Sequence, residues 1–294
     1  MSLEGIMDRF KKNSKKLVLE SYDKLLDYWD VSKEEREIQT SYGMTHVIIT
    51  GKQENPPLLL FHGVGDNSAL MWIFNATYLS QYFWLIAVDV MGGPGKSEPN
   101  QAYYQGFEQC TWILEILDSL KLDKVDIAGV SNGSYLARYF TAKNPNRVKK
   151  VVCMAGGVTL NMFKMMTVFL PEALFPNKSN TKKLLKKLSA PTADIFESNE
   201  HLLEHWNLLL KYFNNHSMMY HKYTEIEEQD FVVLREKALF LIGEYDRLTN
   251  YPKSIEDLKK NKLHFKIIKD AGHGINHEQS DLINHEIVSF LLQI

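Results

Sequence analysis

Ser131 stands between two glycines, in the order Gly129-x-Ser131-x-Gly133, at a point where the chain pattern changes. The apolar run 125–130 predicts a buried strand, and residues 135–143 predict a helix directly after it. A strand that turns into a helix without a loop holds its turning residue in a strained backbone conformation. Glycines two residues to either side relieve the crowding there. We therefore expect the serine hydroxyl to project over the sheet edge, next to a helix N-terminus.

A serine hydroxyl becomes a nucleophile only when a base takes its proton, and an acid must orient that base. Two later loops supply these groups. Asp246 follows the apolar run 239–242, and His273 follows the run 265–268. Because the carboxyl ends of parallel strands meet at one edge of a sheet, we expect both side chains to lie near Ser131.

Charge that develops on a carbonyl oxygen under attack needs preorganised hydrogen-bond donors. The backbone N–H of Asn132 opens the helix after the serine, and that of Val64 follows His62-Gly63 at the end of the apolar run 58–61. These two N–H groups are the expected oxyanion hole.

Plain structural alternatives exist for the same residues. In one alternative, Ser131 is an ordinary turn serine. In another, Asp246 only caps the following helix and Glu244 is the acid. The other histidines near these motifs fit structural places better than the role of base: His62, His277 and His285.

Strands and helices alternate along most of the chain, and the strands are continuous apolar runs. This pattern predicts an α/β fold with a mostly parallel sheet covered by helices on both faces. After the sixth strand the alternation stops at Gly156-Gly157, and only helices follow up to about residue 235. We expect an N-terminal helical segment, a core in two parts and a helical cap, over residues 1–35, 36–157 with 236–294, and 158–235.

Shorter features complete the expected core. Residues 37–50 alternate like strands with a turn at Tyr42-Gly43, and residues 4–30 have the spacing of a helix that lies on the main domain. Single helices are expected over 68–82 and 105–120.

Composition limits the partners. The chain has 294 residues with 34 basic and 36 acidic side chains, and a net charge of −2 gives no sign of nucleic-acid binding. No apolar run approaches the ~18 residues that span a bilayer, and the first 16 residues lack the apolar core of a signal peptide. Cys110 and Cys153 are expected to be reduced. These features favour the cytoplasm, and they leave the oligomeric state open.

The expected cap is rich in soft apolar side chains that pack helices together or face the serine. Five residues are expected to contact substrate, three from the cap and two that follow the His62-Gly63 loop: Met162, Met166, Trp206, Asp66 and Trp72.

Two further patterns lie in the cap. His201-Leu-Leu-Glu204-His205 matches a zinc-binding pattern, but no third ligand follows, so exposed helix residues are the simpler interpretation and no metal is expected. Residues 178–188 form a basic amphipathic helix, interpreted as a solvated helix or, alternatively, as a lid at a membrane surface.

In sum the motifs resemble the α/β-hydrolase superfamily, in the branch with a helical cap between the sixth and seventh strands, over roughly residues 36–294. The resemblance implies Ser131 as nucleophile, His273 as general base and then acid, and Asp246 as its orienting group. Some members carry the acid after the sixth strand, where this chain has no carboxylate. Haloalkane dehalogenases and epoxide hydrolases use an aspartate nucleophile, against which the serine argues. The matching pieces are His62-Gly63, Asp89…Gly95-x-Ser97, Gly129-x-Ser131-x-Gly133, Asp246 and Gly272-His273.

We therefore expect a serine hydrolase without a cofactor, a carboxylesterase that cleaves a small to medium apolar ester through an acyl-enzyme. A thioesterase, a lipase-like enzyme, a carbon–carbon hydrolase and an aminopeptidase remain alternatives with the same triad. A non-catalytic small-molecule-binding homologue is the alternative from another class.

Overall fold

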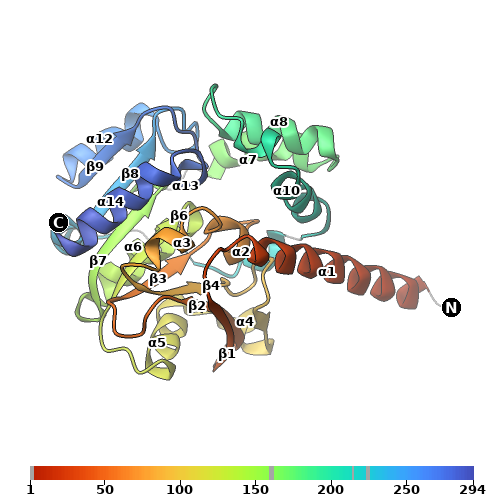
Figure 1. The fold of residues 1–294 in the computed structure, drawn as a ribbon, viewed down its shortest axis with the longest axis horizontal. Coiled ribbons are helices and arrows are strands. Elements are labelled where there is room, and N and C mark those ends of the chain that lie inside the picture. The colour runs from red at the N-terminus through yellow and green to blue at the C-terminus, as the bar shows by residue number, and fades with distance from the viewer. Residues whose placement is uncertain (1–2, 159–161, 214, 223–225) are drawn as a thin grey trace.

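The computed structural model describes residues 3–158, 162–213, 215–222 and 226–294. These residues form a nine-stranded sheet in the order β1-β2-β4-β3-β6-β7-β8-β9, with β5 paired to β2 (Figure 1). The strands are β1 Lys33–Thr40, β2 Gly43–Thr50, β3 Pro57–Phe61, β4 Trp84–Val88, β5 Glu98–Pro99, β6 Val125–Val130, β7 Val148–Met154, β8 Ala238–Gly243 and β9 His264–Ile268.

The six strands from β4 to β9 in this order pair in parallel, whereas β1, β2 and β5 pair antiparallel. This confirms the predicted mostly parallel sheet. The two-residue β5 was not expected, so the helical segment predicted after the sixth strand follows β7.

Helices connect the strands and cover the sheet. They are α1 Leu3–Asp27, α2 Ser68–Met71, α3 Ala76–Leu79, α4 Gln101–Gly106, α5 Gln109–Ser119, α6 Asn132–Lys143, α7 Met162–Ala173, α8 Lys178–Leu188, α9 Ile195–Ser198, α10 Glu200–Tyr212, α11 Glu228–Lys237, α12 Pro252–Lys260, α13 Ile275–Glu278 and α14 Ser280–Leu292, with short 3₁₀ helices η1 Pro145–Arg147 and η2 Asn215–Met218.

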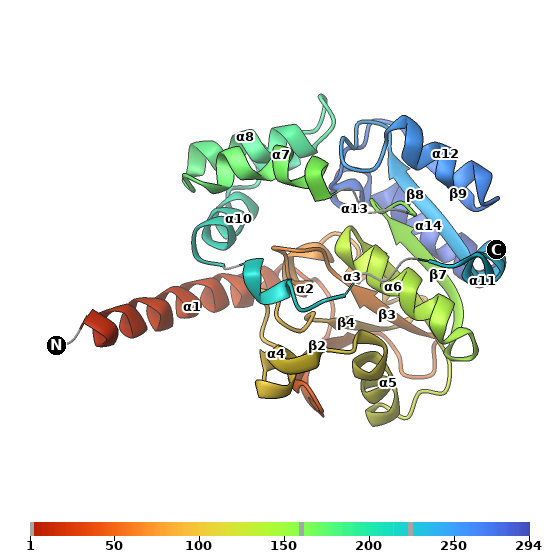
Figure 2. The same ribbon diagram turned by 180° about the vertical axis from the view of Figure 1, so that it is seen from behind.

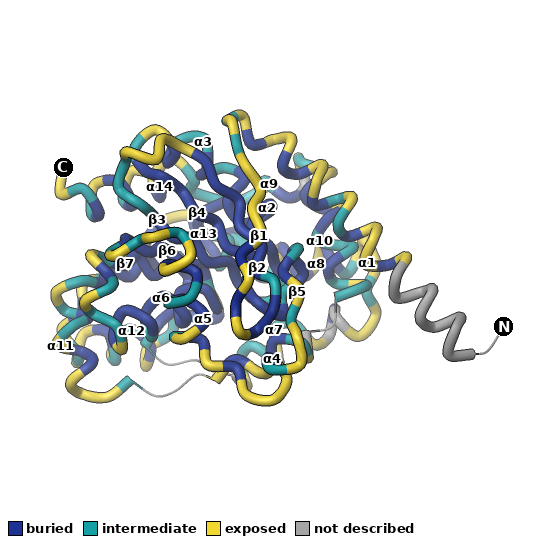
Figure 3. Tube along the Cα trace, turned by 90° about the horizontal axis from the view of Figure 1, so that it is seen from below, coloured by how far each residue is buried: buried dark blue, intermediate teal, exposed yellow. Residues whose placement is uncertain are grey.

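Successive side chains of a strand point to opposite sides, and in the central strands both sides are buried because helices pack on each face. Leu58 and Leu60 of β3 belong to one apolar cluster with α2, α3 and α14, whereas Leu59 and Phe61 belong to a second cluster with α5 and α6. The central strands are accordingly buried along their length (Figure 3). In Figure 1, α3 and α14 lie in front of the sheet. In Figure 2, the view from behind, α5 and α6 lie in front of it.

The expected single helix over 68–82 is wrong, because two short helices, α2 and α3, take its place. A buried amide network holds the break. The Asn75 side chain donates to the side-chain oxygen of Asn284 at 2.8 Å and to the carbonyl of Asn276 at 3.3 Å. The expected helix over 105–120 is likewise divided into α4 and α5, which flank residues 107–108.

The helices after β7 differ in what they cover. In both views α7, α8 and α10 lie together beyond the carboxyl ends of the strands, whereas α11 packs against α6, β7 and β8 (Figures 1 and 2). The division into core and cap at residues 157 and 236 stays a prediction, and these contacts favour a cap that ends before α11.

The buried Asp89 carboxylate, just after β4, joins α1 to the sheet. It accepts hydrogen bonds from the Tyr22 hydroxyl at 2.9 Å, His46 Nδ1 at 3.0 Å, the Ser68 N–H at 3.0 Å and the Lys96 N–H at 2.8 Å. Burial favours the neutral acid, but these donors outweigh it and hold the pKa of Asp89 well below its usual range. The carboxylate is thus a charged node that joins the end of α1 to β2, to the start of α2 and to the loop that contains Lys96.

The structure also bears on the cysteines and on the absence of a long apolar run, both noted from composition. Cys110 and Cys153 are both free thiols, and Cys153 is buried. Across the described residues, none of the helices has the length and apolar character needed to cross a membrane.

Tyr22→Phe removes the buried O–H donor to Asp89 while the ring keeps its packing. We expect the free energy of unfolding, measured by urea titration, to fall by about 1–3 kcal/mol, because a hydrogen bond to a charged group is lost. Tyr28→Phe is the control, since its side chain is exposed, and should change stability by less than about 0.5 kcal/mol. Equal effects of the two substitutions would contradict the role given to Asp89.

Candidate active site

Ser131 occupies the turn between β6 and α6 with φ 55° and ψ −116°, a backbone conformation that costs a non-glycine residue free energy. The neighbouring glycines permit the turn. A Cβ on Gly129 would lie 2.2 Å from the carbonyl oxygen of Gly133, and one on Gly133 would lie 2.2 Å from that of Phe61. The Ser131 N–H donates to the Met154 carbonyl at 2.8 Å, which ties the turn to the end of β7.

His273 lies in the loop after β9 and faces the serine. Its Nε2 is 2.9 Å from Ser131 Oγ, the distance over which the hydroxyl donates its proton to an imidazole nitrogen. The backbone N–H of His273 donates to the carbonyl of Leu188, at the end of α8, at 2.6 Å. The position of this histidine therefore depends on the helical segment above the sheet.

Asp246, in the loop after β8, lies behind His273. Its carboxylate oxygens are 3.0 and 3.1 Å from His273 Nδ1. They also accept the N–H groups of Leu248 and Thr249 at 2.9 and 3.2 Å, and the Thr249 hydroxyl. Glu244, the alternative acid, is exposed and accepts the N–H of Asp270 instead.

The Asp246–His273 pair is buried, and its charges control both pKa values. Burial disfavours either charge, but the nearby imidazole and three donors hold the pKa of Asp246 below its usual range. Burial also lowers the pKa of His273, and the Asp246 carboxylate outweighs this effect and raises it. The result is a carboxylate that orients the imidazole and increases its basicity.

Glu278, which the sequence did not suggest, holds the loop that contains His273 in place. Its carboxylate accepts the N–H of Gly272 at 2.9 Å and the N–H of Ala190 at 2.7 Å. Burial raises the pKa of this carboxyl against the effect of these donors. Thr249 was also missed, although an aspartate side chain commonly accepts the backbone N–H two residues on, as Asp246 does from Leu248, and so orders the loop that contains Thr249.

The loop after β3 approaches the serine closely. A Cβ on Gly63 would lie 3.3 Å from the Cβ of Ser131, and the next residue, Val64, lines the cavity above. Asn132 is the first residue of α6, where backbone N–H groups have no partner within the helix. Both backbone N–H groups proposed as an oxyanion hole thus belong to segments that adjoin Ser131.

A cavity of about 310 Å³ lies between the sheet and the helices above it, and Ser131 and His273 are on its wall. Most of its surface is apolar, and α7, α8, α9 and α10 contribute many of the lining side chains. The principal apolar residues are Met71, Val130, Met165, Phe169, Leu184, Leu185, Leu188, Phe196, Leu209, Leu210 and Phe213.

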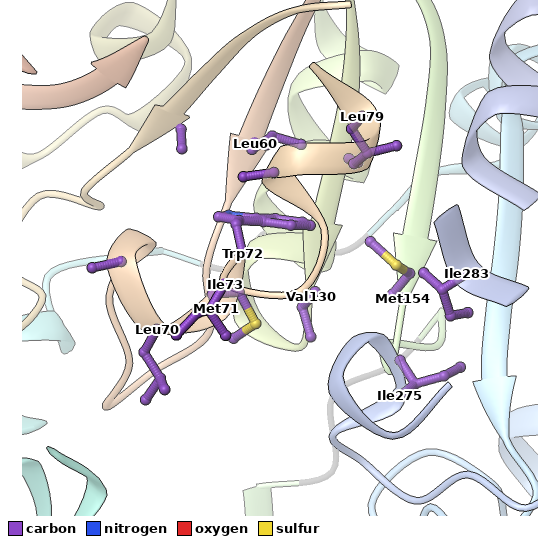
Figure 4. Packing of buried hydrophobic residues seen from close by; sticks show 14 of the residues in the cluster. Leu60, Leu70, Met71, Trp72, Ile73, Leu79, Val130, Met154, Ile275 and Ile283 are labelled. Carbon is purple, nitrogen blue, oxygen red and sulfur yellow. The ribbon is translucent and has the colours of Figure 1, made fainter. Parts of the chain in front are cut away.

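The expected substrate contacts divide into three groups. Asp66 and Trp206 line the cavity. Trp72 does not, because it is fully buried in the core cluster with Leu60 and Leu79 (Figure 4), and its neighbour Met71 lines the cavity instead. The side chains of two further expected residues lie outside the described part of the structure: Met162 and Met166.

Asp66 places an uncharged acid in this apolar space. Its Oδ1 accepts the N–H of Asn67 at 2.8 Å, and burial raises its pKa to about 8, with the charge of Asp89 adding to the effect. The carboxyl is therefore protonated at neutral pH and supplies an O–H donor to the cavity.

The zinc pattern of α10 has a structural role. His205 is buried, not exposed as expected, and its ring nitrogens contact Ser21 Oγ and Asn67 Nδ2, each at 2.9 Å. Burial lowers the pKa of His205 to about 3. Both nitrogens are engaged in holding α10 against α1 and the loop after β3. Among the described residues, histidines, cysteines and carboxylates nowhere cluster in a way that would hold a metal ion.

Fold and site together define a class: α/β proteins whose serine, on a strand-to-helix turn at the carboxyl edge of a parallel sheet, contacts a histidine–aspartate pair. The family described as alpha/beta hydrolase fold matches residues 56–280, and the chain belongs to this family.

Individual relatives agree with this assignment. The chain is 25% identical to carboxylesterase YbfK of Bacillus subtilis over 280 residues. This alignment covers 92% of each chain. The crystal structure of that carboxylesterase, CesB (YbfK), superposes with a TM-score of 0.80 at 23% identity, over 96% of this chain and 99% of that one. The structure of naproxen esterase (carboxylesterase NP) from Bacillus subtilis gives a TM-score of 0.79 at 22% identity, over 93% and 96%.

Asp246→Asn tests the coupling between the two buried groups. Without the carboxylate the pKa of His273 falls, so the acid limb of the kcat/KM profile on an activated ester should shift to lower pH. The loss of orientation should lower kcat by about 10³–10⁴-fold. Glu244→Gln is the control and should leave both quantities near those of the parent. An unchanged acid limb in Asp246→Asn would contradict the assignment.

Asp66→Asn tests the buried neutral acid through stability. Unfolding brings the pKa of this carboxyl from about 8 down to ~4, so between these pH values the folded state binds one more proton. The free energy of unfolding of the parent should therefore fall as pH rises from 5 to 8, by up to about 1.4 kcal/mol per pH unit, and the variant should lose this component. Urea titrations at several pH values measure it, with the exposed Asp281→Asn as the control. Parallel profiles of parent and Asp66→Asn would refute the raised pKa.

Proposed function

We propose that this chain is a carboxylesterase that works through a serine nucleophile. The observation that carries the proposal is the 2.9 Å contact between Ser131 Oγ and His273 Nε2 on the wall of a covered cavity. Similarity to carboxylesterases over nearly the full chain supports it.

The proposed reaction begins with the attack of Ser131 Oγ on the ester carbonyl while His273 takes its proton. The N–H groups of Val64 and Asn132 bind the oxyanion, and Asp246 stabilises the imidazolium that forms. His273 then gives the proton to the leaving alcohol. A water molecule repeats the sequence on the acyl-enzyme and regenerates the serine. Apart from substrate and water, the proposed reaction uses only groups that this chain provides.

The proposed substrate is a small to medium apolar ester. The cavity volume of about 310 Å³ and the apolar side chains of its upper wall support this choice. Polar residues also line the cavity, among them Asp66, whose carboxyl is neutral, and Asn276. These two are the proposed partners of a polar substituent on the substrate.

Thioesters, amides and carbon–carbon bonds are competing targets of the same three residues, because each is cleaved by attack on a carbonyl group. A small-molecule-binding homologue with an inactive serine is the competing function from another class. Rates on matched esters, thioesters and amides of graded chain length separate the enzymatic candidates, and reactivity of the serine separates them from the binding protein.

Ser131→Ala should abolish hydrolysis of short-chain p-nitrophenyl esters, with kcat reduced by at least about 10⁴-fold, while the circular dichroism spectrum is retained. The parent should react with a fluorophosphonate probe at Ser131, and the variant should not. Ser134→Ala, in the first turn of α6, is the control for reactivity of a nearby serine and should retain labelling. Turnover in Ser131→Ala would exclude this residue as the nucleophile, and an unlabelled parent would favour the binding protein.

A further inference from the structure

Helix α7 carries an exposed apolar stripe on the outside of the molecule. Phe163, Leu170 and Leu174 have 78, 47 and 61% of their surface accessible, and the adjoining Phe175 has 71%. Spacings of seven and four residues place the first three on one face of a helix, and the Leu174 N–H donates to the Leu170 carbonyl, which continues the helical turn. Large apolar side chains that gather on one exposed face mark an interaction site.

The opposite face of α7 is also apolar, because Met165 and Phe169 line the cavity that contains Ser131. A helix that is apolar on both sides is typical of a buried position. Here one side faces the site and the other faces outward. Whatever covers the stripe therefore sits directly on the upper wall of the cavity.

Helix α8 adds positive charge next to this stripe. Its inward residues Leu184 and Leu188 are buried against the cavity. On one side Lys187 binds the Glu172 carboxylate of α7, at 2.6 Å, and on the other Lys178 binds the Glu200 carboxylate of α10, at 2.6 Å. The buried leucines, together with these ion pairs, define which face of α8 points outward.

The outward face of α8 is therefore basic. Lys182 and Lys183 are both exposed; Lys183 lies opposite the buried Leu185 and Leu188, and Lys182 lies on the flank of the helix, at the edge of a pocket between α8 and α9. Figures 1 and 2 show α7 and α8 side by side at the end of the molecule farthest from the amino ends of the strands. An apolar stripe with exposed lysines on the neighbouring helix has the chemistry of a helix pair that lies in the headgroup region of an anionic membrane.

We propose that the outer face of the α7–α8 pair, formed by Phe163, Leu170, Leu174, Phe175, Lys182 and Lys183, docks on an anionic lipid–water interface. The apolar side chains enter the boundary of the acyl chains, and the lysines contact anionic headgroups. A second copy of the chain fits this surface less well, because a two-fold contact would bring the same lysines of both copies together.

This docking has a consequence for the site. Because α7 and α8 separate the cavity from the outer surface, a docked molecule holds the cavity against the interface into which apolar esters partition. Membrane docking itself needs no catalysis, so it stands or falls independently of the carboxylesterase proposal and is measured with an inactive protein.

The experiment is co-sedimentation of Ser131→Ala with vesicles of phosphatidylcholine, with and without phosphatidylglycerol as one third of the lipid. We expect binding to the anionic vesicles that weakens as salt is added, and little binding to phosphatidylcholine alone. In this background, Lys182→Glu with Lys183→Glu should weaken binding by about 10-fold or more, and Phe163→Ser with Leu174→Ser should abolish it.

Matched controls lie elsewhere on the surface. Lys259→Glu with Lys260→Glu changes the same charge on α12, and Val232→Ser removes an exposed apolar side chain from α11. Both should leave binding unchanged. The proposal is overturned by equal binding to the two kinds of vesicle, by equal losses in the controls, or by a stable dimer in solution that the Phe163→Ser and Leu174→Ser changes dissociate.

Discussion

The strained backbone of Ser131 is the constraint on which the rest of the site depends. A φ of 55° in a residue with a side chain costs on the order of 1–3 kcal/mol and persists only where the surroundings enforce it. They do so here because β6 is central, with β3 on one side and β7 on the other. The missing side chain of Gly133 lets α6 pass so close to β3 that a Cβ there would lie 2.2 Å from the Phe61 carbonyl oxygen. The serine hydroxyl is thus presented at the sheet edge by the packing of the whole core.

The histidine is positioned from two directions. Asp246 holds the imidazole through Nδ1, and the Leu188 carbonyl holds its backbone from the end of α8. Glu278 joins the same loop to Ala190, just beyond α8. A displacement of α8 therefore moves His273 as well as the cavity wall, so the covering helices are part of the candidate site. The same α8 carries exposed lysines, so the outer surface is connected with His273 through this helix.

Much of this arrangement was predictable because it follows from local rules and from topology. Glycines around Ser131 signal a tight strand-to-helix turn, and Asp246 and His273 each follow an apolar strand at the edge where parallel strands end. Contacts between distant side chains were not predictable. Sequence reasoning chose Trp72 for the cavity, yet the break between α2 and α3, held by Asn75 and its distant amide partners, buries that ring and exposes Met71 to the cavity.

The sequence by itself determined the class of fold and indicated the candidate serine, histidine and aspartate with their order along the chain. It could do so because the periodicity of apolar residues and the sterics of a tight turn act over a few residues. Only the tertiary structure decided which side chains line the cavity, why His205 is buried, and how α7 presents one apolar face inward and another outward. These features depend on the rotation of helices packed by residues far apart in the chain, and no local pattern encodes that rotation.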